Sequence, residues 1–328
     1  MDWWSVLRGA ELLYGGLLLL LGGIAGSFAS AAIYRIPAED LSLIRPARSF
    51  CPSCKHTLSW FDNLPFFGWI LLRGRCRYCG VTFGGAYLIH EIGLAVLFYH
   101  AGYSWAGEQG PLALGLFLIT LTALWIAATI DFKHFILPDG ITLGGIVFGI
   151  AVAFLEPAFQ MGLGTLELPW GVSWLGLTLE NTPQKVAFAS SFLGAGISFL
   201  LLFGIRTLFR YILGQEALGL GDVKYLTAVG ALLGLEGAIW AFFVGVLVGA
   251  LFGLLNIVRM ICLIASRRSR RKRLANWRLT VFRGWWLGRV IPFGPPLILG
   301  TGLVLFAQDS LRTFFLQTWP RLIQDFLT

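Results

Sequence analysis

Long apolar stretches alternate with short polar segments along the whole chain. A stretch of about 17 to 25 apolar residues is long enough to cross a bilayer as a helix, in which every backbone polar group is satisfied internally. The sequence therefore predicts an all-α polytopic membrane protein with about eight transmembrane helices. The expected spans are residues 12–34, 87–104, 111–130, 140–156, 186–205, 224–238, 239–261 and 291–308.

Composition and charge agree with this placement. Apolar residues make up 57% of the chain and charged residues 13%, which excludes an ordinary soluble domain. Lys and Arg gather in two segments, residues 35–77 after the first span and residues 267–289 after the seventh. Such loops stay on the cytoplasmic side of a bacterial inner membrane, so residues 131–139 and 206–223 are expected on that side too. Both termini are then expected outside.

Three segments have other interpretations. Ala29-Ser30-Ala31 resembles a signal-peptide cleavage site, but the apolar stretch is long and its positive charge follows it, which favours a membrane span. Residues 156–185 are expected as an external loop. The basic loop 262–290 is expected to anchor the topology and to contact membrane lipid, and nucleic acid is not expected as a partner. Residues 309–328 are expected as a C-terminal tail.

Four of the five cysteines lie between the first two spans, as the pairs Cys51–Cys54 and Cys76–Cys79. Two pairs of this spacing form a tetrahedral zinc site, because each short turn brings two sulfurs to one side. Disulfides are less favourable in a reducing cytoplasm, and His56 is an alternative ligand. With four ligands and no open position, the metal would stabilise a small cytoplasmic zinc-binding domain, residues 35–86, rather than catalyse a reaction.

Two aspartates stand at the ends of apolar stretches. Asp131 ends the third span, and Asp222 begins the sixth within Gly219-Leu220-Gly221-Asp222-Val223-Lys224. A carboxylate at membrane depth is costly and is by default a functional-site hypothesis. Gly219 and Gly221 permit close approach or unusual backbone angles beside the acid, which would suit a substrate strand. The residues alone leave helix N-capping open as the role of Asp222 and of Asp139.

A close pair of carboxyl groups has a definite chemistry. The two cannot both ionise, so they share a proton near neutral pH. The ionised member can take a proton from water as it attacks a peptide carbonyl, while the protonated member donates to the carbonyl oxygen. Such a pair titrates as a unit, so the sequence does not assign the two roles.

Six motifs occur in a fixed order between residues 26 and 296. They are Gly26-Ser27-Phe28 through Ile33-Tyr34-Arg35-Ile36-Pro37, the paired cysteines, Asp62-Asn63-Leu64-Pro65 with Leu71 through Cys79, Asp131 through Leu137-Pro138-Asp139, Glu216 through Lys224, and Ile291-Pro292-Phe293-Gly294-Pro295. Because it has these motifs in this order, the chain resembles the bacterial type IV prepilin peptidases, also called prepilin leader peptidase and N-methyltransferase enzymes.

The resemblance implies a site and a reaction. Asp131 and Asp222 would be the catalytic pair of an aspartic endopeptidase whose transmembrane core is residues 87–308. The residues that would bind substrate or support the pair are Asp139, Glu216, Gly219, Gly221 and Lys224. The implied substrates are prepilins and pilin-like secretion subunits (pseudopilins), cut on the cytoplasmic side after a short basic leader that ends in glycine.

A second activity is also implied. Family members with the cysteine domain often methylate the new N-terminus with S-adenosylmethionine. This chain departs from the family pattern at Leu88, where proline is common, and at Ala29 to Ala32, where asparagine is usual, and it has no glycine-rich Rossmann turn for the methyl donor. These departures concern methylation rather than the peptidase site.

Two rival functions fit part of the pattern. In a transporter, Asp131 and Asp222 would bind protons or cations, but no inverted repeat is visible and both acids fall near a membrane boundary. In a noncatalytic secretion-system scaffold, the zinc-binding domain would dock partners and neither aspartate would be needed.

Overall fold

The fold is described by a computed structural model of the chain. It describes residues 3–38, 41–46, 48–157, 159, 183–214, 218–270, 292–321 and 324. This part of the chain is mostly helical and contains no β-strand beyond two isolated bridges. In chain order the elements are α1 (Trp3–Gly9), α2 (Glu11–Arg35), η1 (Trp60–Asn63), α3 (Phe67–Leu71), α4 (Ala86–Gly102), α5 (Trp105–Gln109), α6 (Pro111–His134), α7 (Asp139–Leu155), α9 (Pro183–Leu213), α10 (Leu220–Arg270), α12 (Gly294–Thr313) and η3 (Phe314–Thr318). The predicted all-α class is confirmed.

Among the described residues, four helices are long and apolar enough to cross a membrane: α2, α6, most of α9, and α10 as far as Ile264. The helices α7 and α12 are apolar but shorter. The membrane character is therefore supported, whereas the number of eight spans is not confirmed. The predicted spans 224–238 and 239–261 form one helix, α10, which is interrupted at Gly234 (φ 71°, ψ −177°). Hydropathy does not locate this break because the sequence stays apolar on both sides of it.

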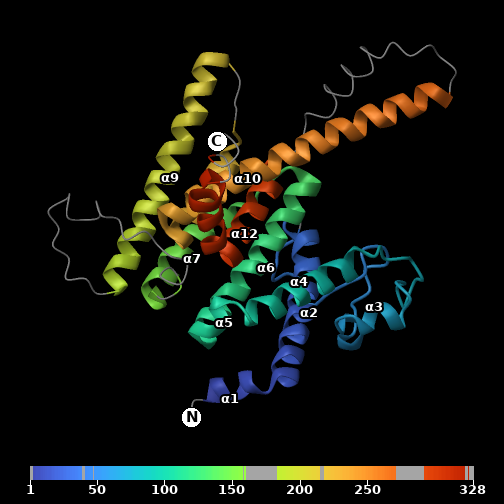
Figure 1. The fold of residues 1–328 in the computed structure, drawn as a ribbon. Helices are drawn as coiled ribbons and strands as arrows, with labels where there is room; N and C mark the ends of the chain where they lie inside the picture. Colours follow the sequence, from blue (N-terminus) through green and yellow to red (C-terminus); the bar gives the residue numbers. More distant parts are fainter. Residues whose placement is uncertain are drawn as a thin grey trace.

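The helix α10 lies at the centre of one group of helices and packs against α7, α9 and α12 (Figure 1). Glycines allow this close packing: a Cβ atom on Gly194 of α9 would overlap the backbone oxygen of Gly230 of α10. A second pair, α2 and α4, packs in the same way, because a Cβ atom on Gly26 would overlap the backbone of Glu91. The segment that carries the paired cysteines lies beside this second pair (Figure 1).

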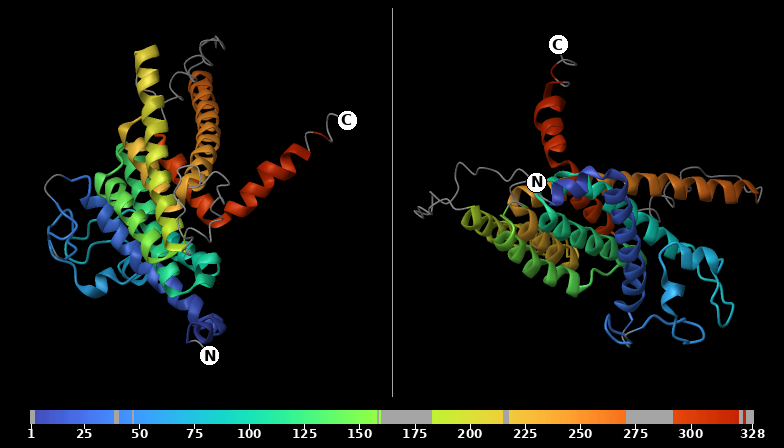
Figure 2. Two further views of the ribbon diagram at one scale, coloured as in Figure 1. Left: turned by 90° about the vertical axis from the view of Figure 1, so that its left-hand side faces the viewer. Right: turned by 90° about the horizontal axis from the view of Figure 1, so that it is seen from below.

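The C-terminal part of α10 projects from the helical bundle (Figure 2). Its large apolar side chains are exposed, for example Leu251 and Leu254 at 57% and 60%. An uncovered apolar surface of this length fits a helix that faces lipid. The segment 262–290, predicted as a loop, begins as helix as far as Arg270, and its remainder lies outside the described residues. Most of the predicted external loop 156–185 lies outside them too.

Candidate active site and metal centre

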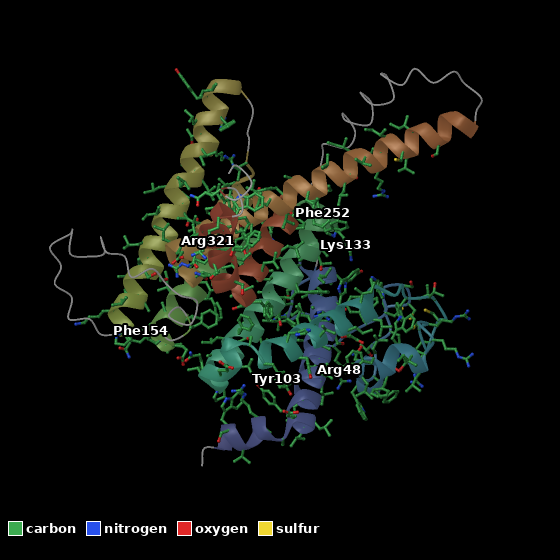
Figure 3. The ribbon with its side chains drawn as sticks, viewed as in Figure 1. Arg48, Tyr103, Lys133, Phe154, Phe252 and Arg321 are labelled. Carbon is green, nitrogen blue, oxygen red and sulfur yellow. The ribbon has the colours of Figure 1, made fainter. Side chains whose placement is uncertain are left out.

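Asp131 lies in the last turn of α6 and is buried, with 5% of its surface exposed. The helix ends three residues later because Phe135 adopts a left-handed conformation (φ 58°), and its N–H donates to the Asp131 carbonyl oxygen at 2.9 Å. Four residues then lead to α7. In Figure 3, Lys133 marks this end of α6 and Tyr103 lies toward its other end. The predicted position of Asp131 at the end of its helix is thus observed.

Asp222 is the third residue of α10, in the first helical turn. The two acid-bearing segments meet, because a Cβ atom on Gly221 would lie 3.3 Å from Cβ of Leu137 in the connection after α6. The segments that carry Asp131 and Asp222, far apart in the sequence, are therefore neighbours, and we call the region around the two acids the acidic site.

The two glycines before Asp222 act by close approach. Neither has a positive φ, so the expected unusual backbone angles are not observed. A Cβ atom on Gly219 would stand 3.2 Å from Oδ2 of Asp222, so any side chain there would crowd the carboxylate. Gly221 packs against the chain's own Leu137, and this contact brings the two acidic segments together.

Lys224 and Asp139 form an ion pair, with Nζ and Oδ1 2.8 Å apart. The pair joins the fifth residue of α10 to the first residue of α7. Asp139 does not cap its helix, because the N-cap position is Pro138 and no side-chain capping bond is present there. Asp222 also lies inside its helix rather than at the N-cap. Neither acid therefore occupies the N-cap position of its helix. Glu216 lies outside the described residues.

Gly294, the first residue of α12, also belongs to the acidic site. A Cβ atom on Gly294 would overlap Oδ2 of Asp131 and lie 2.8 Å from its Cγ. That buried Oδ2 has no hydrogen-bond partner among the described residues. Gly294 belongs to the last of the six sequence motifs, but no role for it was expected from the sequence. The one signal in the sequence was a glycine between two prolines, in Pro292-Phe293-Gly294-Pro295, which is compatible with a position where no side chain fits.

The four paired cysteines form the second candidate site. Their sulfur atoms all lie within 4.8 Å of one another, and Sγ of Cys51 is 3.8 Å from Sγ of Cys79. A tetrahedral zinc ion with Zn–S bonds of about 2.3 Å requires sulfurs about 3.8 Å apart. The four thiols therefore fit a tetrahedral zinc ion, as predicted. His56 is not part of this cluster, and its ring packs against Tyr78 with centroids 3.7 Å apart.

Both cysteine pairs are presented by the same backbone turn. The carbonyl oxygens of Cys51 and Cys76 accept the N–H of the residue four positions later, Lys55 at 2.9 Å and Gly80 at 3.0 Å. Lys55 and Gly80 have positive φ angles of 58° and 70°. These turns direct both sulfurs of each pair to one side, the arrangement that a four-thiolate metal site requires.

The Cys51 thiol ionises more readily than an ordinary thiol. Burial acts against its ionisation, but hydrogen bonds from the backbone of Cys54 and Ser53 outweigh burial and lower the pKa of Cys51 to about 7. Metal ligation by cysteine uses the thiolate form, which the surroundings of Cys51 favour.

Two buried polar residues attach the cysteine-bearing segment to the helices. Arg35 at the end of α2 donates hydrogen bonds of 3.0 Å to the carbonyl oxygens of Leu43 and Arg48. Glu91 of α4 accepts the N–H of Phe66 at 2.7 Å through Oε2. Glu91 therefore has a structural partner in this segment.

The comparisons with known proteins decide the family. Residues 20–105 match the Bacterial Peptidase A24 N-terminal domain, and residues 118–254 match the Type IV leader peptidase family. A protein of Klebsiella pneumoniae named prepilin leader peptidase/N-methyltransferase is 36% identical over 227 residues, which are 68% of this chain and 86% of the relative. The chain belongs to the prepilin leader peptidase family.

Other members of the prepilin leader peptidase family match with different coverage. A relative of the same name from Aeromonas hydrophila is 27% identical over 331 residues, 94% of this chain and 96% of its own. One from Myxococcus xanthus (strain DK1622) is 34% identical over 254 residues, 75% of this chain and 64% of its own. No solved structure matches the chain. The family resemblance predicted from the motifs is confirmed.

Each of the two family matches covers one of the two candidate sites. The N-terminal match includes the cysteine pairs and α4, and the Type IV leader peptidase match includes both Asp131 and Asp222. Gly294 lies beyond both matches, so its place beside Asp131 is seen only in the fold.

Proposed function

We propose that this protein is the aspartic endopeptidase that removes the short basic leader from type IV prepilins and pilin-like secretion subunits. Asp131 and Asp222 are its catalytic pair. The observation that supports this most is the contact of Gly221 with Leu137, which brings the start of α10 with Asp222 beside the end of α6 with Asp131, in a chain of the prepilin leader peptidase family.

The two carboxyl groups share the work of peptide hydrolysis. Because the negative charge of one disfavours ionisation of the other, the pair holds one proton between them near neutral pH. The ionised carboxylate takes a proton from the attacking water, and the protonated carboxyl donates to the carbonyl oxygen of the scissile bond. The amine of the mature pilin-like protein then leaves with a proton from the pair.

The membrane topology follows from charge. We infer eight spans, with α10 counted on each side of its break at Gly234, and with α4, α7 and α12 completing the set. The basic segments after α2 and within the C-terminal part of α10 are placed in the cytoplasm. The active site then faces the cytoplasm, the side on which the basic leaders of the substrates lie. Both termini of the chain lie outside.

Two cofactors belong to the proposal. The thiolates of Cys51, Cys54, Cys76 and Cys79 would hold a structural zinc ion that stabilises the small domain of residues 35–86. The relatives carry the name N-methyltransferase, which supports a second activity in which S-adenosylmethionine methylates the new N-terminal amine. No residue of this chain is assigned to the methyl donor.

Cleavage of a defined precursor tests the peptidase assignment. The protein in detergent is incubated with a prepilin that carries a glycine-terminated leader, and the products are measured by mass. Wild type and Glu108→Gln, a control carboxylate exposed in α5, should cut after the glycine, while Asp131→Asn and Asp222→Asn should not. If either aspartate variant cuts at the normal rate, the proposed pair is wrong. If the wild type fails on several precursors, the transporter and scaffold functions become the better account.

A further inference from the structure

One face of α12 contacts both helices that carry the proposed catalytic acids. Gly294 lies against the carboxylate of Asp131, where a Cβ atom would overlap Oδ2. Thr301, seven residues later, accepts a hydrogen bond of 2.9 Å from the hydroxyl of Tyr225, which is one turn beyond Asp222 in α10. Residues seven apart lie on the same helix face, about 10 Å apart along the axis.

Both contacts are enclosed. Thr301 and Tyr225 are 0% and 3% exposed, so their hydrogen bond is shielded from water. The Thr301 hydroxyl donates in turn to the carbonyl oxygen of Leu297 at 3.0 Å, which fixes its orientation. At the other contact the backbone of Gly294 is not in the left-handed region, so space alone excludes a side chain there.

The middle of α10, just beyond its break at Gly234, holds α12 in this position. A Cβ atom on Gly245 would lie 2.9 Å from Cα of Leu297, and one on Gly300 would lie 2.6 Å from the carbonyl oxygen of Ala241. Glycines at both sides of this interface let the two backbones touch. α10 carries Asp222 at its start, and the residues that follow its break at Gly234 pack against α12. The same helix therefore also fixes α12, which lies against Asp131.

We propose that the N-terminal half of α12 is the positioning element of the catalytic pair, with Gly294 setting the Asp131 carboxylate and the Tyr225–Thr301 hydrogen bond setting the turn that carries Asp222. This inference rests on the proposed function. It gives Gly294, Tyr225 and Thr301 a role in the reaction that acts through the two acids, not through contact with the substrate. A displacement of about 1 Å at a catalytic group can cost on the order of 100-fold in rate.

The first test separates positioning from binding. Gly294→Ala should lower kcat at least tenfold with KM within twofold of wild type, because the substrate-binding surface stays while Asp131 is displaced. Gly302→Ala is the matched control, since Gly302 belongs to the same helix and has open space beside it. Its kcat and KM should equal those of the wild type. Tyr225→Phe keeps the ring and should also lower kcat several-fold with KM unchanged.

The second test needs no activity. Thermal unfolding in detergent is compared for Gly294→Ala, Asp131→Ala and the double variant. Because the added methyl group competes with the Asp131 carboxylate for one space, the double variant should have a higher Tm than the sum of the two single shifts predicts. This cycle reports the contact even if the peptidase assignment fails.

Each outcome of these tests either supports or overturns the positioning role of α12. The proposal stands if the Tm shifts are non-additive and both Gly294→Ala and Tyr225→Phe reduce kcat selectively. Additive Tm shifts would show that Gly294 and Asp131 do not interact and would overturn it, whatever the activity. A Gly294→Ala variant with normal kcat, or a Tyr225→Phe variant that raises KM instead of lowering kcat, would also overturn it. If the wild type cleaves no precursor while the shifts are non-additive, the proposed function fails but the contact is real.

Discussion

Nζ of Lys224 lies 2.8 Å from Oδ1 of Asp139, and this ion pair joins the N-terminal ends of α10 and α7 beside the acidic site. The Lys224 and Asp139 side chains are 27% and 64% exposed. An exposed pair of this kind contributes about 0–1 kcal/mol to stability. The pair therefore contributes little to the free energy of unfolding.

The ion pair predicts a difference between Asp139 and the proposed catalytic acids. Asp139→Asn should keep cleavage within about tenfold of wild type, because a loosened helix start costs about 1 kcal/mol or less, whereas Asp131→Asn should abolish it. The exchange Asp139→Lys with Lys224→Asp should recover part of the loss. Cleavage rates of purified variants check this. An Asp139→Asn variant as inactive as Asp131→Asn would move Asp139 into the catalytic machinery.

The cysteine cluster predicts a bound metal that stabilises its own segment. Purified protein should contain one zinc ion per chain, and Cys76→Ser should lose it, because three thiolates hold the ion less tightly than four. Residues 36–85 should then become sensitive to protease while the transmembrane helices stay protected. Elemental analysis and limited proteolysis measure both effects. Cys262→Ser is the control, since this exposed cysteine in α10 is not part of the cluster. Full zinc content in Cys76→Ser would contradict the assignment.

The break in α10 predicts a strong requirement for glycine. Gly234 has φ 71° and ψ −177°, a conformation that other residues adopt at a cost of about 1–3 kcal/mol. Gly234→Ala should therefore lower the free energy of unfolding by about that amount. Gly204→Ala in α9, a position with open space and no positive φ, should be neutral or slightly stabilising. Denaturant or thermal unfolding in detergent compares the two, and equal stability would show that α10 does not break at Gly234.

A second ion pair joins the far end of α12 to α10. Nε of Arg312 lies 3.0 Å from Oε1 of Glu236, whose side chain is 10% exposed. Arg312→Met should destabilise the protein by about 1–3 kcal/mol, because it leaves a mostly buried carboxylate without this cation. Adding Glu236→Leu should recover part of the loss, because the buried charge is then removed. Unfolding of the three variants measures this, and a double variant less stable than Arg312→Met would be the contrary result.

The sequence determined much of the site's chemistry because the relevant signals are local. Hydropathy over about 20 residues marks apolar helices, and the spacing of Cys51–Cys54 and Cys76–Cys79 specifies a four-thiolate cluster. Asp131 and Asp222 stand out because a carboxylate at the end of an apolar helix is costly. These features hold for any arrangement of the helices, so the chain alone reveals them.

The tertiary structure decided which of these residues meet. The contact of Gly294 with Asp131, the Lys224–Asp139 pair and the bond from Phe66 to Glu91 each join residues from different helices or segments. Such contacts depend on the crossing and depth of packed helices, which glycines such as Gly194 and Gly300 set by allowing backbones to touch. No local pattern encodes that geometry. The sequence by itself thus supplied the two acids and the four thiols, and the packing of α12 against α6 and α10 decided what surrounds the acids.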